Sequence, residues 1–140
     1  MNNMPACDEC GQWEAPSLAV DAIVINSDKI LLIRRKNEPW KGMLAFPGGF
    51  VEKNEDPEVA VIRELKEECG LEGLIQKLVC VEGSPDRDPR GHVVSIAYLV
   101  YAEGKPIAGD DAAEAAWYNL SEINELAGDH YSMLEQLNFT

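Results

Sequence analysis

Basic residues are scarce in this sequence of 140 residues. Its 12 lysines and arginines stand against 25 aspartates and glutamates, which gives a formal net charge of −13. Duplex nucleic acid and anionic membrane surfaces are bound by basic faces, so this balance argues against both as partners. An anionic small molecule can still bind, provided that cations or a local group of arginines neutralise the place where it meets the protein.

Long apolar runs are also missing, since none approaches the roughly 20 residues of a membrane-spanning helix. The start of the chain, MNNMPACDECGQWEAPS, has neither the basic beginning nor the apolar centre of a signal peptide. We therefore expect no membrane association and a cytoplasmic location. With 46% hydrophobic and 26% charged residues, the composition is that of a globular protein that can bury its core as one domain.

Cysteine is limited to Cys7, Cys10, Cys69 and Cys80. Cys7 and Cys10 have the spacing of half a zinc ribbon, but no second C-x-x-C follows to complete four ligands. Zinc binding, an adventitious disulfide, or no role in a flexible tail stay open for this pair. Cys69 and Cys80 stand among apolar residues, where a thiol usually behaves as a small buried hydrophobe.

Turn residues divide the rest of the chain into strands and helices. Residues 1–16 are interpreted as a flexible N-terminal arm with the C-x-x-C pair, and residues 17–140 as a single domain. A turn at residues 26–28 predicts a hairpin, and Ser121 is the predicted N-cap of one or two closing helices. The predicted strands are residues 17–25, 29–35, 74–82, 92–102 and 114–120. Strands mixed with helices predict a mixed sheet with helices on its faces.

Residues 57–69 carry the signals of a complete helix. Asp56 suits the N-cap, Pro57 the first helical position and Gly70 the position after the last turn. At about 100° per residue, one stripe of this helix is apolar and would pack on the sheet. The stripe consists of Val61, Ile62, Leu65 and Cys69.

A second stripe of the same helix is acidic. Glu64, Glu67 and Glu68 are related as i, i+3 and i+4, so their carboxylates converge, although like charges at these spacings destabilise a helix by about 0.2–0.5 kcal/mol per pair. Gly49 lies nearby in the sequence and has no side chain to obstruct a ligand. Three carboxylates beside a free carbonyl suit a hard cation such as Mg²⁺ or Mn²⁺. A solvated acidic surface is the alternative interpretation.

The spacing of these residues resembles the Nudix hydrolase signature at every defined position. Gly49 is followed after five residues by Glu55, and after seven more by the run RELKEECGL at residues 63–71. The order of predicted strands and helices over residues 17–137 is similar as well. The resemblance implies an α/β fold of the α+β type, a Nudix-like α/β/α sandwich with a mixed β-sheet and flanking helices.

Nudix hydrolases use divalent metals to cleave a nucleoside diphosphate linked to another group. The resemblance therefore implies Mg²⁺ as cofactor, with Mn²⁺ as a possible substitute. It assigns Glu55 and Arg63 a structural role, locking the loop onto the helix, and places Leu65 and Leu71 in the core. The implied metal ligands are the carbonyl of Gly49 and the carboxylates of Glu64, Glu67 and Glu68.

The resemblance leaves the general base open. Some Nudix enzymes use the glutamate equivalent to Glu64, and others use an acid on a loop outside the signature. The loop candidates are Asp110, Asp111 and Glu114, and Glu114 ranks first because it adjoins a predicted strand. Simple solvation of the loop is the alternative for all three.

Segments outside the signature, at residues 38–52, 84–100 and 109–130, resemble the branch that includes ADP-ribose pyrophosphatases. Arginines are the candidate ligands for phosphate or ribose, and the alternative for two of them is pairing with neighbouring aspartates. Candidate substrate residues are Arg35, Arg87 and Arg90, with Asp86 and Asp88 as the alternative partners. Tryptophans can stack on adenine or pack in the core; the candidates are Trp40 and Trp117. His130 either approaches the site or is a cap or packed residue.

The leading functional hypothesis is hydrolysis of ADP-ribose to AMP and ribose 5-phosphate. One alternative keeps the chemistry and changes the substrate to an oxidised nucleoside triphosphate or another nucleotide sugar. Another is a non-catalytic Nudix-type domain that senses a ligand. The resemblance also implies a homodimer, because enzymes of this branch often complete their sites with a partner chain.

Overall fold

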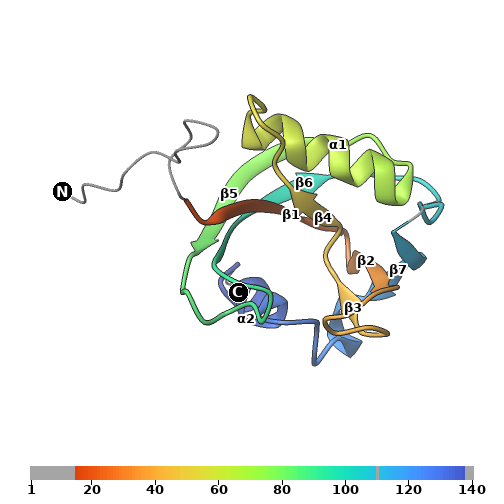
Figure 1. The fold of residues 1–140 in the computed structure, drawn as a ribbon. Coiled ribbons are helices and arrows are strands. Elements are labelled where there is room, and N and C mark those ends of the chain that lie inside the picture. Colours follow the sequence, from red (N-terminus) through yellow and green to blue (C-terminus); the bar gives the residue numbers. More distant parts are fainter. Residues whose placement is uncertain (1–14, 110, 138–140) are drawn as a thin grey trace.

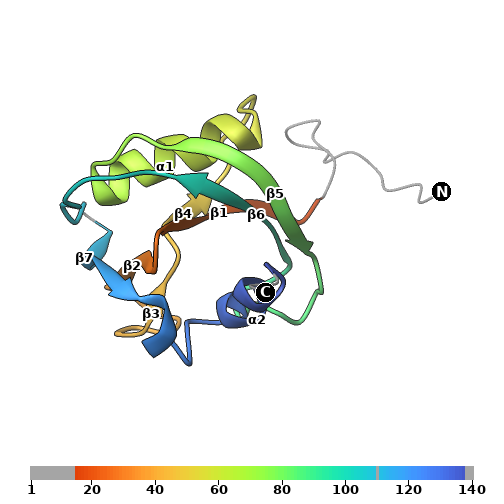
Figure 2. The same cartoon turned by 180° about the vertical axis from the view of Figure 1, so that it is seen from behind.

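A computed structural model describes residues 15–109 and 111–137. Within them, a mixed sheet lies between helix α1 on one side and helix α2 on the other (Figures 1 and 2). The strands are β1 (Ser17–Asn26), β2 (Lys29–Arg35), β3 (Leu44–Ala45), β4 (Gly48–Phe50), β5 (Leu74–Glu82), β6 (Val93–Tyr101) and β7 (Ala112–Asn119). The helices are α1 (Pro57–Cys69), the 3-10 helix η1 (Leu120–Glu122) and α2 (His130–Glu135). The predicted roles of Cys7, Cys10 and Asp110 fall outside the described residues.

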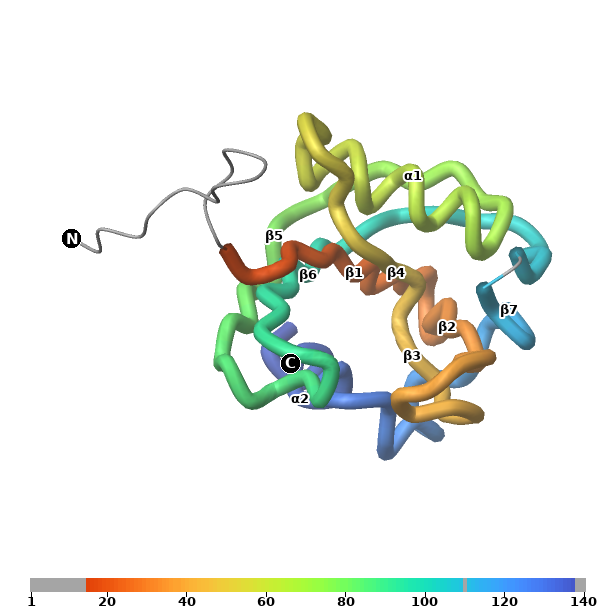
Figure 3. Tube along the Cα trace, in the orientation of Figure 1, coloured from red at the N-terminus to blue at the C-terminus, as the bar shows by residue number. Residues whose placement is uncertain are grey.

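The sheet has the strand order β3-β2-β1-β6-β5, with β4 paired to β1 and β7 paired to β2. β1 and β6 run parallel, whereas the other strand pairs are antiparallel. The predicted mixed sheet with flanking helices is therefore confirmed. Figure 3 shows the chain passing from β3 through β4, which lies beside β1, into the loop that precedes α1.

β1 separates two apolar clusters, because alternate side chains of a strand point to opposite faces. Val20, Ala22 and Val24 pack with the α1 side of the core, where Val61 and other apolar residues of α1 are buried. Ile23 packs on the opposite side with the apolar face of α2. Nothing polar is expected in such a two-sided strand, so Asp21, which is only 6% exposed, stands out.

Helix α1 has the predicted bounds and the predicted caps. Asp56 Oδ1 accepts a hydrogen bond of 2.8 Å from the Glu58 amide, Pro57 occupies the first turn, and Gly70 adopts φ 71°. Cys69 is fully buried, and burial raises the pKa of its thiol to about 12. Cys80 is half-buried, and burial raises the pKa of its thiol to about 11, so both thiols behave as small hydrophobes.

The end of the chain departs from the prediction. Ser121 is not an N-cap: it lies inside the short 3-10 helix η1, whose N-cap residue Asn119 makes no side-chain cap hydrogen bond. The amide of Leu120 instead donates to the carbonyl of Asp28 at 2.9 Å, so the hairpin turn satisfies the start of η1.

No helix in residues 15–109 and 111–137 has the length and apolar character to cross a membrane.

Candidate active site

A cavity of about 450 Å³ opens between α1, the strand β4 and the loops that precede β6 and α2. It brings together side chains from segments far apart in the sequence. The predicted site residues that line it are Arg35, Trp40, Gly49, Arg63, Glu64, Glu68, Arg87, Arg90, Asp111 and His130. Glu55, Glu67 and Glu114 are not among its lining residues.

The two glycines of β4 bring backbone directly against the carboxylates of α1. A Cβ on Gly49 would lie 2.5 Å from Cδ of Glu64, and one on Gly48 would lie 2.3 Å from the carbonyl oxygen of Val20. The Gly48 amide donates to Oε1 of Glu68 at 3.1 Å. A side chain at Gly48 would meet the backbone of β1, and one at Gly49 would displace the Glu64 carboxylate, so this close approach depends on glycine.

Glu68 and Glu64 are crowded by other acids. Glu68 is 6% exposed, and burial raises the pKa of its carboxyl to about 8; the Gly48 amide opposes this rise, whereas Glu64, Asp111 and Asp21 add to it. Burial likewise raises the pKa of Glu64, opposed by Arg63. Carboxylates in this environment are stabilised by a proton or by a cation.

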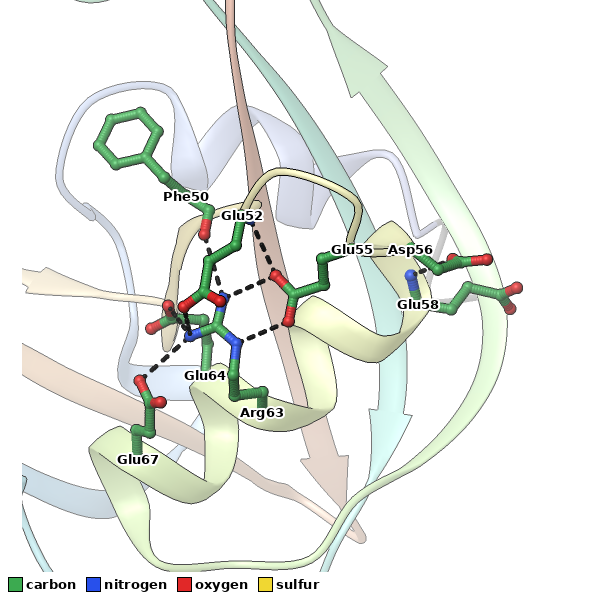
Figure 4. Close-up of polar contacts among 8 residues, drawn as sticks. All are labelled: Phe50, Glu52, Glu55, Asp56, Glu58, Arg63, Glu64 and Glu67. Atoms are coloured by element: carbon green, nitrogen blue, oxygen red, sulfur yellow. Dashed lines mark hydrogen bonds and ion pairs between the residues drawn. The ribbon is translucent and has the colours of Figure 1, made fainter.

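Arg63 holds the loop before α1 to the helix (Figure 4). Its guanidinium donates from Nε and Nη2 to the two oxygens of Glu55 at 2.7 and 2.9 Å, and from Nη2 to the Phe50 carbonyl at 3.2 Å. This hydrogen bonding lowers the pKa of Glu55 to about 2. Nη1 also donates to Glu64 Oε1 at 2.8 Å and to Glu67 Oε2 at 3.2 Å.

The donor chemistry fits a divalent cation, although the side chains are not gathered around one point. Glu64, Glu68 and the backbone of Gly49 offer hard oxygen donors, and burial together with the neighbouring acids raises the pKa of Glu68. The Glu67 side chain is 57% exposed and is turned toward Arg63. In the part of the chain that the structure describes, no three His, Cys, Asp or Glu side chains are arranged to hold a metal ion.

Arg87 is part of a partly buried ion pair. Its Nε and Nη2 donate to both oxygens of Asp129 at 2.8 and 2.7 Å, and its Nη1 donates to Ser95 Oγ at 2.9 Å. The side chain is 10% exposed. Its partner is thus Asp129, 42 residues away, in place of the neighbour Asp86. Arg87 fixes the loop before β6 to the start of α2.

Arg90 makes the pair that was the alternative to ligand binding. Its Nη2 and Nε donate to the two oxygens of Asp88 at 2.8 and 3.1 Å. The guanidinium also lies 5.4 Å from the ring centre of Phe50, a cation–π distance, and both side chains are substantially exposed. Arg90 and Phe50 therefore lie together in the wall of the cavity.

The two arginines at the end of β2 point to different surroundings, because Arg35 lines the cavity and Arg34 does not. Arg35 lines the cavity, donates from Nε to the Pro39 carbonyl at 2.6 Å, and has its pKa lowered by burial. Arg34 donates to Glu114 Oε1 at 2.8 Å across the β2–β7 pair. Glu114 lies in β7, as its predicted proximity to a strand implied, but outside the cavity lining, whereas Asp111 lines the cavity.

Asp21 and His130 form a polar pair, of which the sequence analysis identified only His130. His130 Nδ1 accepts a hydrogen bond from the Phe46 amide at 3.1 Å, so the neutral ring carries its proton on Nε2, which lies 3.4 Å from Asp21 Oδ1. The ring stacks on Phe46 with centroids 4.6 Å apart. Burial raises the pKa of Asp21. A lone acid in the apolar run of residues 17–25 was the signal that could have identified Asp21.

The two tryptophans have different surroundings. Trp40 lines the cavity, and its ring lies so close to Gly128 that a Cβ there would be 3.2 Å from the indole. Trp117 packs against the core on the α1 side and donates from Nε1 to the Gly104 carbonyl at 2.7 Å. Of the pair, Trp40 has the position from which a ring can face a ligand.

Comparison with known proteins gives a consistent result. The chain matches the NUDIX domain family over residues 15–137. It is 50% identical over 121 residues to an ADP-ribose pyrophosphatase of Methanocaldococcus jannaschii, an alignment that covers 86% of this chain and 72% of that protein. It is 31% identical over 134 residues to the ADPR responsive transcriptional repressor NtrR of Acinetobacter baylyi, covering 89% of this chain and 54% of the repressor.

A solved structure agrees with the sequence relatives. The NUDIX domain of Shewanella oneidensis NrtR, determined in complex with ADP ribose, superposes with a TM-score of 0.80 at 29% identity. The alignment covers 89% of this chain and 88% of that domain. The described chain therefore spans most of that domain, but only about half of the repressor from Acinetobacter baylyi.

Proposed function

The chain belongs to the Nudix family, and from this premise we propose that it hydrolyses the pyrophosphate bond of ADP-ribose to give AMP and ribose 5-phosphate. The observation that carries the proposal is the pair of crowded carboxylates, Glu64 and Glu68, beside the side-chain-free backbone of β4 in a cavity. The name of the relative at 50% identity supports the choice of substrate.

Nudix hydrolases generally use divalent metals, and we propose Mg²⁺ here, with Mn²⁺ as a substitute. The Gly49 carbonyl, Glu64, Glu67 and Glu68 would hold the ion, with Glu67 exchanging its contact with Arg63 for the site. The ion would supply charge neutralisation and Lewis acidity to a pyrophosphate. The positive charge of an ion would matter here, because arginines that line the cavity are already paired with carboxylates: Arg63, Arg87 and Arg90.

For the proton transfer we propose Asp111 or Glu64. Asp111 takes the place of Glu114 as the loop candidate, because it lines the cavity and its charge acts on Glu64 and Glu68. A general base must lie within reach of the attacking water, and Glu114 is instead held by Arg34 on β7. Asp110 lies outside the described residues and stays a prediction.

We propose three kinds of substrate contact. Arg35 binds phosphate, since it lines the cavity at the end of β2. Arg90 contacts the substrate from the wall that it shares with Phe50. Arg87 holds the cavity wall in place through Asp129, because its buried donors are already used. Trp40 offers its ring to the adenine.

A substrate panel tests the proposal. Purified protein is incubated with ADP-ribose, other nucleotide sugars and oxidised nucleoside triphosphates in Mg²⁺ or Mn²⁺, and the products are separated by chromatography. We expect AMP and ribose 5-phosphate, with ADP-ribose turned over fastest and no reaction in a chelator. Preference for an oxidised triphosphate or another nucleotide sugar would replace the proposed substrate and keep the chemistry.

Two substitutions on α1 connect the reaction to the site. Glu67→Gln and Glu68→Gln should each lower turnover by about a hundredfold or more while the circular dichroism spectrum stays unchanged, because each removes a proposed metal ligand and no packing. Glu58→Gln, which neutralises another glutamate of α1 outside the cavity lining, is the control and should keep wild-type turnover. Unchanged rates in both site variants would contradict the assignment.

The second candidate is a ligand-sensing domain, which the relationship to the repressor NtrR favours. Calorimetry with ADP-ribose separates the two functions. A sensor would bind ADP-ribose and release no AMP over hours, whereas the proposed enzyme would turn it over.

The predicted homodimer remains a proposal, tested by light scattering of the same preparation.

A further inference from the structure

The loop at residues 103–109, between β6 and β7, is attached to the C-terminal end of α1 through its backbone. The Ile107 amide donates to the Cys69 carbonyl at 2.9 Å, and the Gly109 amide donates to the Glu68 carbonyl at 2.8 Å. The last carbonyls of a helix have no partner within it, and these two amides satisfy those of Glu68 and Cys69. The side chain of Ile107 is 74% exposed and adds little to the attachment.

Gly109 approaches the helix more closely than any side chain would allow. A Cβ at this position would lie 2.0 Å from the carbonyl oxygen of Glu67 and 3.2 Å from Cα of Glu68. Both atoms belong to the backbone of α1, which is packed on the sheet and cannot move aside. Close approach to the helix, and no unusual φ, is therefore what requires glycine here.

Asp111 follows two residues later and lines the cavity. The Ala112 amide donates to the Gly109 carbonyl at 3.3 Å, and Ala112 is buried at the start of β7. Asp111 is thus placed between two fixed points, the contact of Gly109 with α1 and the first residue of β7. Its charge acts on both Glu64 and Glu68.

We propose that Gly109 is a positioning residue of this site: by docking on the backbone of Glu67 and Glu68, it sets the place of the Asp111 carboxylate relative to the carboxylates of α1. The inference rests on the proposed divalent-metal site. Glu67 and Glu68 have two functions in this arrangement, since their side chains serve the site while their backbone seats the loop that brings the next acid.

The test is a double-mutant cycle read out by Mn²⁺ affinity, measured by electron paramagnetic resonance without substrate. Gly109→Ala should weaken Mn²⁺ binding by about tenfold, because the loop must lift from α1 and carry Asp111 with it. Asp111→Asn should weaken it to a similar extent. In the Asp111→Asn background, Gly109→Ala should change the affinity by less than about twofold, since the carboxylate through which it acts is gone.

Two controls separate position from general damage. Ile107→Ala changes an exposed side chain of the same loop and should keep wild-type affinity. Gly83→Ala is the matched glycine substitution, since its Cβ would make an ordinary contact of 3.6 Å with Val94. If Gly109→Ala does not fold, Ile107→Pro removes the neighbouring amide donor without adding bulk at position 109 and should weaken Mn²⁺ binding in the same way.

Each result has a distinct meaning. Unchanged Mn²⁺ affinity in Gly109→Ala, or an equal loss with and without Asp111, would overturn the positioning role and leave the proposed hydrolysis intact. Wild-type affinity in Asp111→Asn would overturn the part given to Asp111 and the positioning role together. A wild-type protein that hydrolyses no member of the substrate panel, yet shows the expected affinity cycle, would refute the proposed function and support the inference.

Discussion

At the scale of single residues, this site buries carboxyl groups close to one another, which disfavours their charged forms. Glu68 is almost fully buried, and its carboxylate accepts a hydrogen bond from the Gly48 amide, which is neutral. Asp21 is buried on the neighbouring strand. Burying ionised groups without full compensation costs stability, which a fold tolerates when a ligand later supplies the missing charge.

The burial of Glu68 predicts a specific pH dependence. Its pKa is about 8 in the folded protein against an ordinary 4.5, so the folded state holds a proton that the unfolded state has lost. In a chelator, the free energy of unfolding should therefore fall as pH rises from about 4.5 to about 8, by an amount on the order of a few kcal/mol. Urea denaturation across this range measures the effect.

Glu68→Gln is the variant that isolates this contribution. Its free energy of unfolding should decrease less between pH 4.5 and pH 8 than that of the wild type, because glutamine has no proton to lose. Glu64 and Asp21, whose pKa values are also raised by burial, leave a remaining slope of the same sign. Equal slopes in both proteins would show that Glu68 is not the titrating group.

The arginines around the cavity should differ in their contribution to stability. Arg87 is 10% exposed and makes paired hydrogen bonds to Asp129, so Arg87→Lys should lower the free energy of unfolding by about 2–3 kcal/mol. Arg90 is 46% exposed, so Arg90→Lys should cost less than about 1 kcal/mol. Chemical denaturation of the two variants gives the comparison, and similar losses would contradict it.

At the scale of elements, α1 is the part of the fold that depends most on local signals. Asp56, Pro57 and Gly70 fix both ends, and each acts within a few residues of its own position. Gly70→Ala places a side chain at φ 71°, which should lower the free energy of unfolding by about 1 kcal/mol. Turnover at 25 °C should stay near wild type, because Gly70 lies outside the cavity lining. Thermal denaturation beside a rate measurement tests both statements.

The same locality explains which predictions succeeded. The helix and the strands β2 and β5 have the predicted bounds, because turn residues and periodicity define them within short windows. β4 escaped detection, since Gly48–Phe50 is a strand only through its pairing with β1. Ser121 failed as a cap because the distant Asp28 satisfies the start of η1.

In the site, too, local features could be predicted from the sequence and contacts between distant segments could not. The match to the NUDIX domain family confirms the family prediction. The family could be predicted because the signature residues lie close together in the sequence, along one helix and the strand before it. Partners from distant segments could not be inferred: Arg87 binds Asp129 and Arg34 binds Glu114 only because the sheet brings them together. Nor could the sequence reveal that Glu114 would be turned to Arg34 while Asp111 faces the cavity.

At the scale of the whole molecule, the net charge of −13 makes cations a determinant of stability. Self-repulsion among the acids opposes the compact state at low salt. Monovalent salt should relieve it by screening, which acts on every exposed charge alike. A divalent cation bound at Glu64 and Glu68 would raise the free energy of unfolding further, beyond the effect of screening. A ligand that binds only the folded state stabilises it according to its concentration and affinity.

The last prediction separates these two effects. In 0.3 M NaCl, where screening is largely complete, millimolar Mg²⁺ or Mn²⁺ should still raise the melting temperature of the wild type by several degrees, since a ligand present at 100 times its dissociation constant stabilises by about 2.7 kcal/mol. The control Glu58→Gln should keep this rise, and Glu67→Gln should lose most of it by losing a ligand. A rise of the same size in all three proteins would mean that the ions act on the acidic surface as a whole. The carboxylates of α1 would then not form a specific metal site.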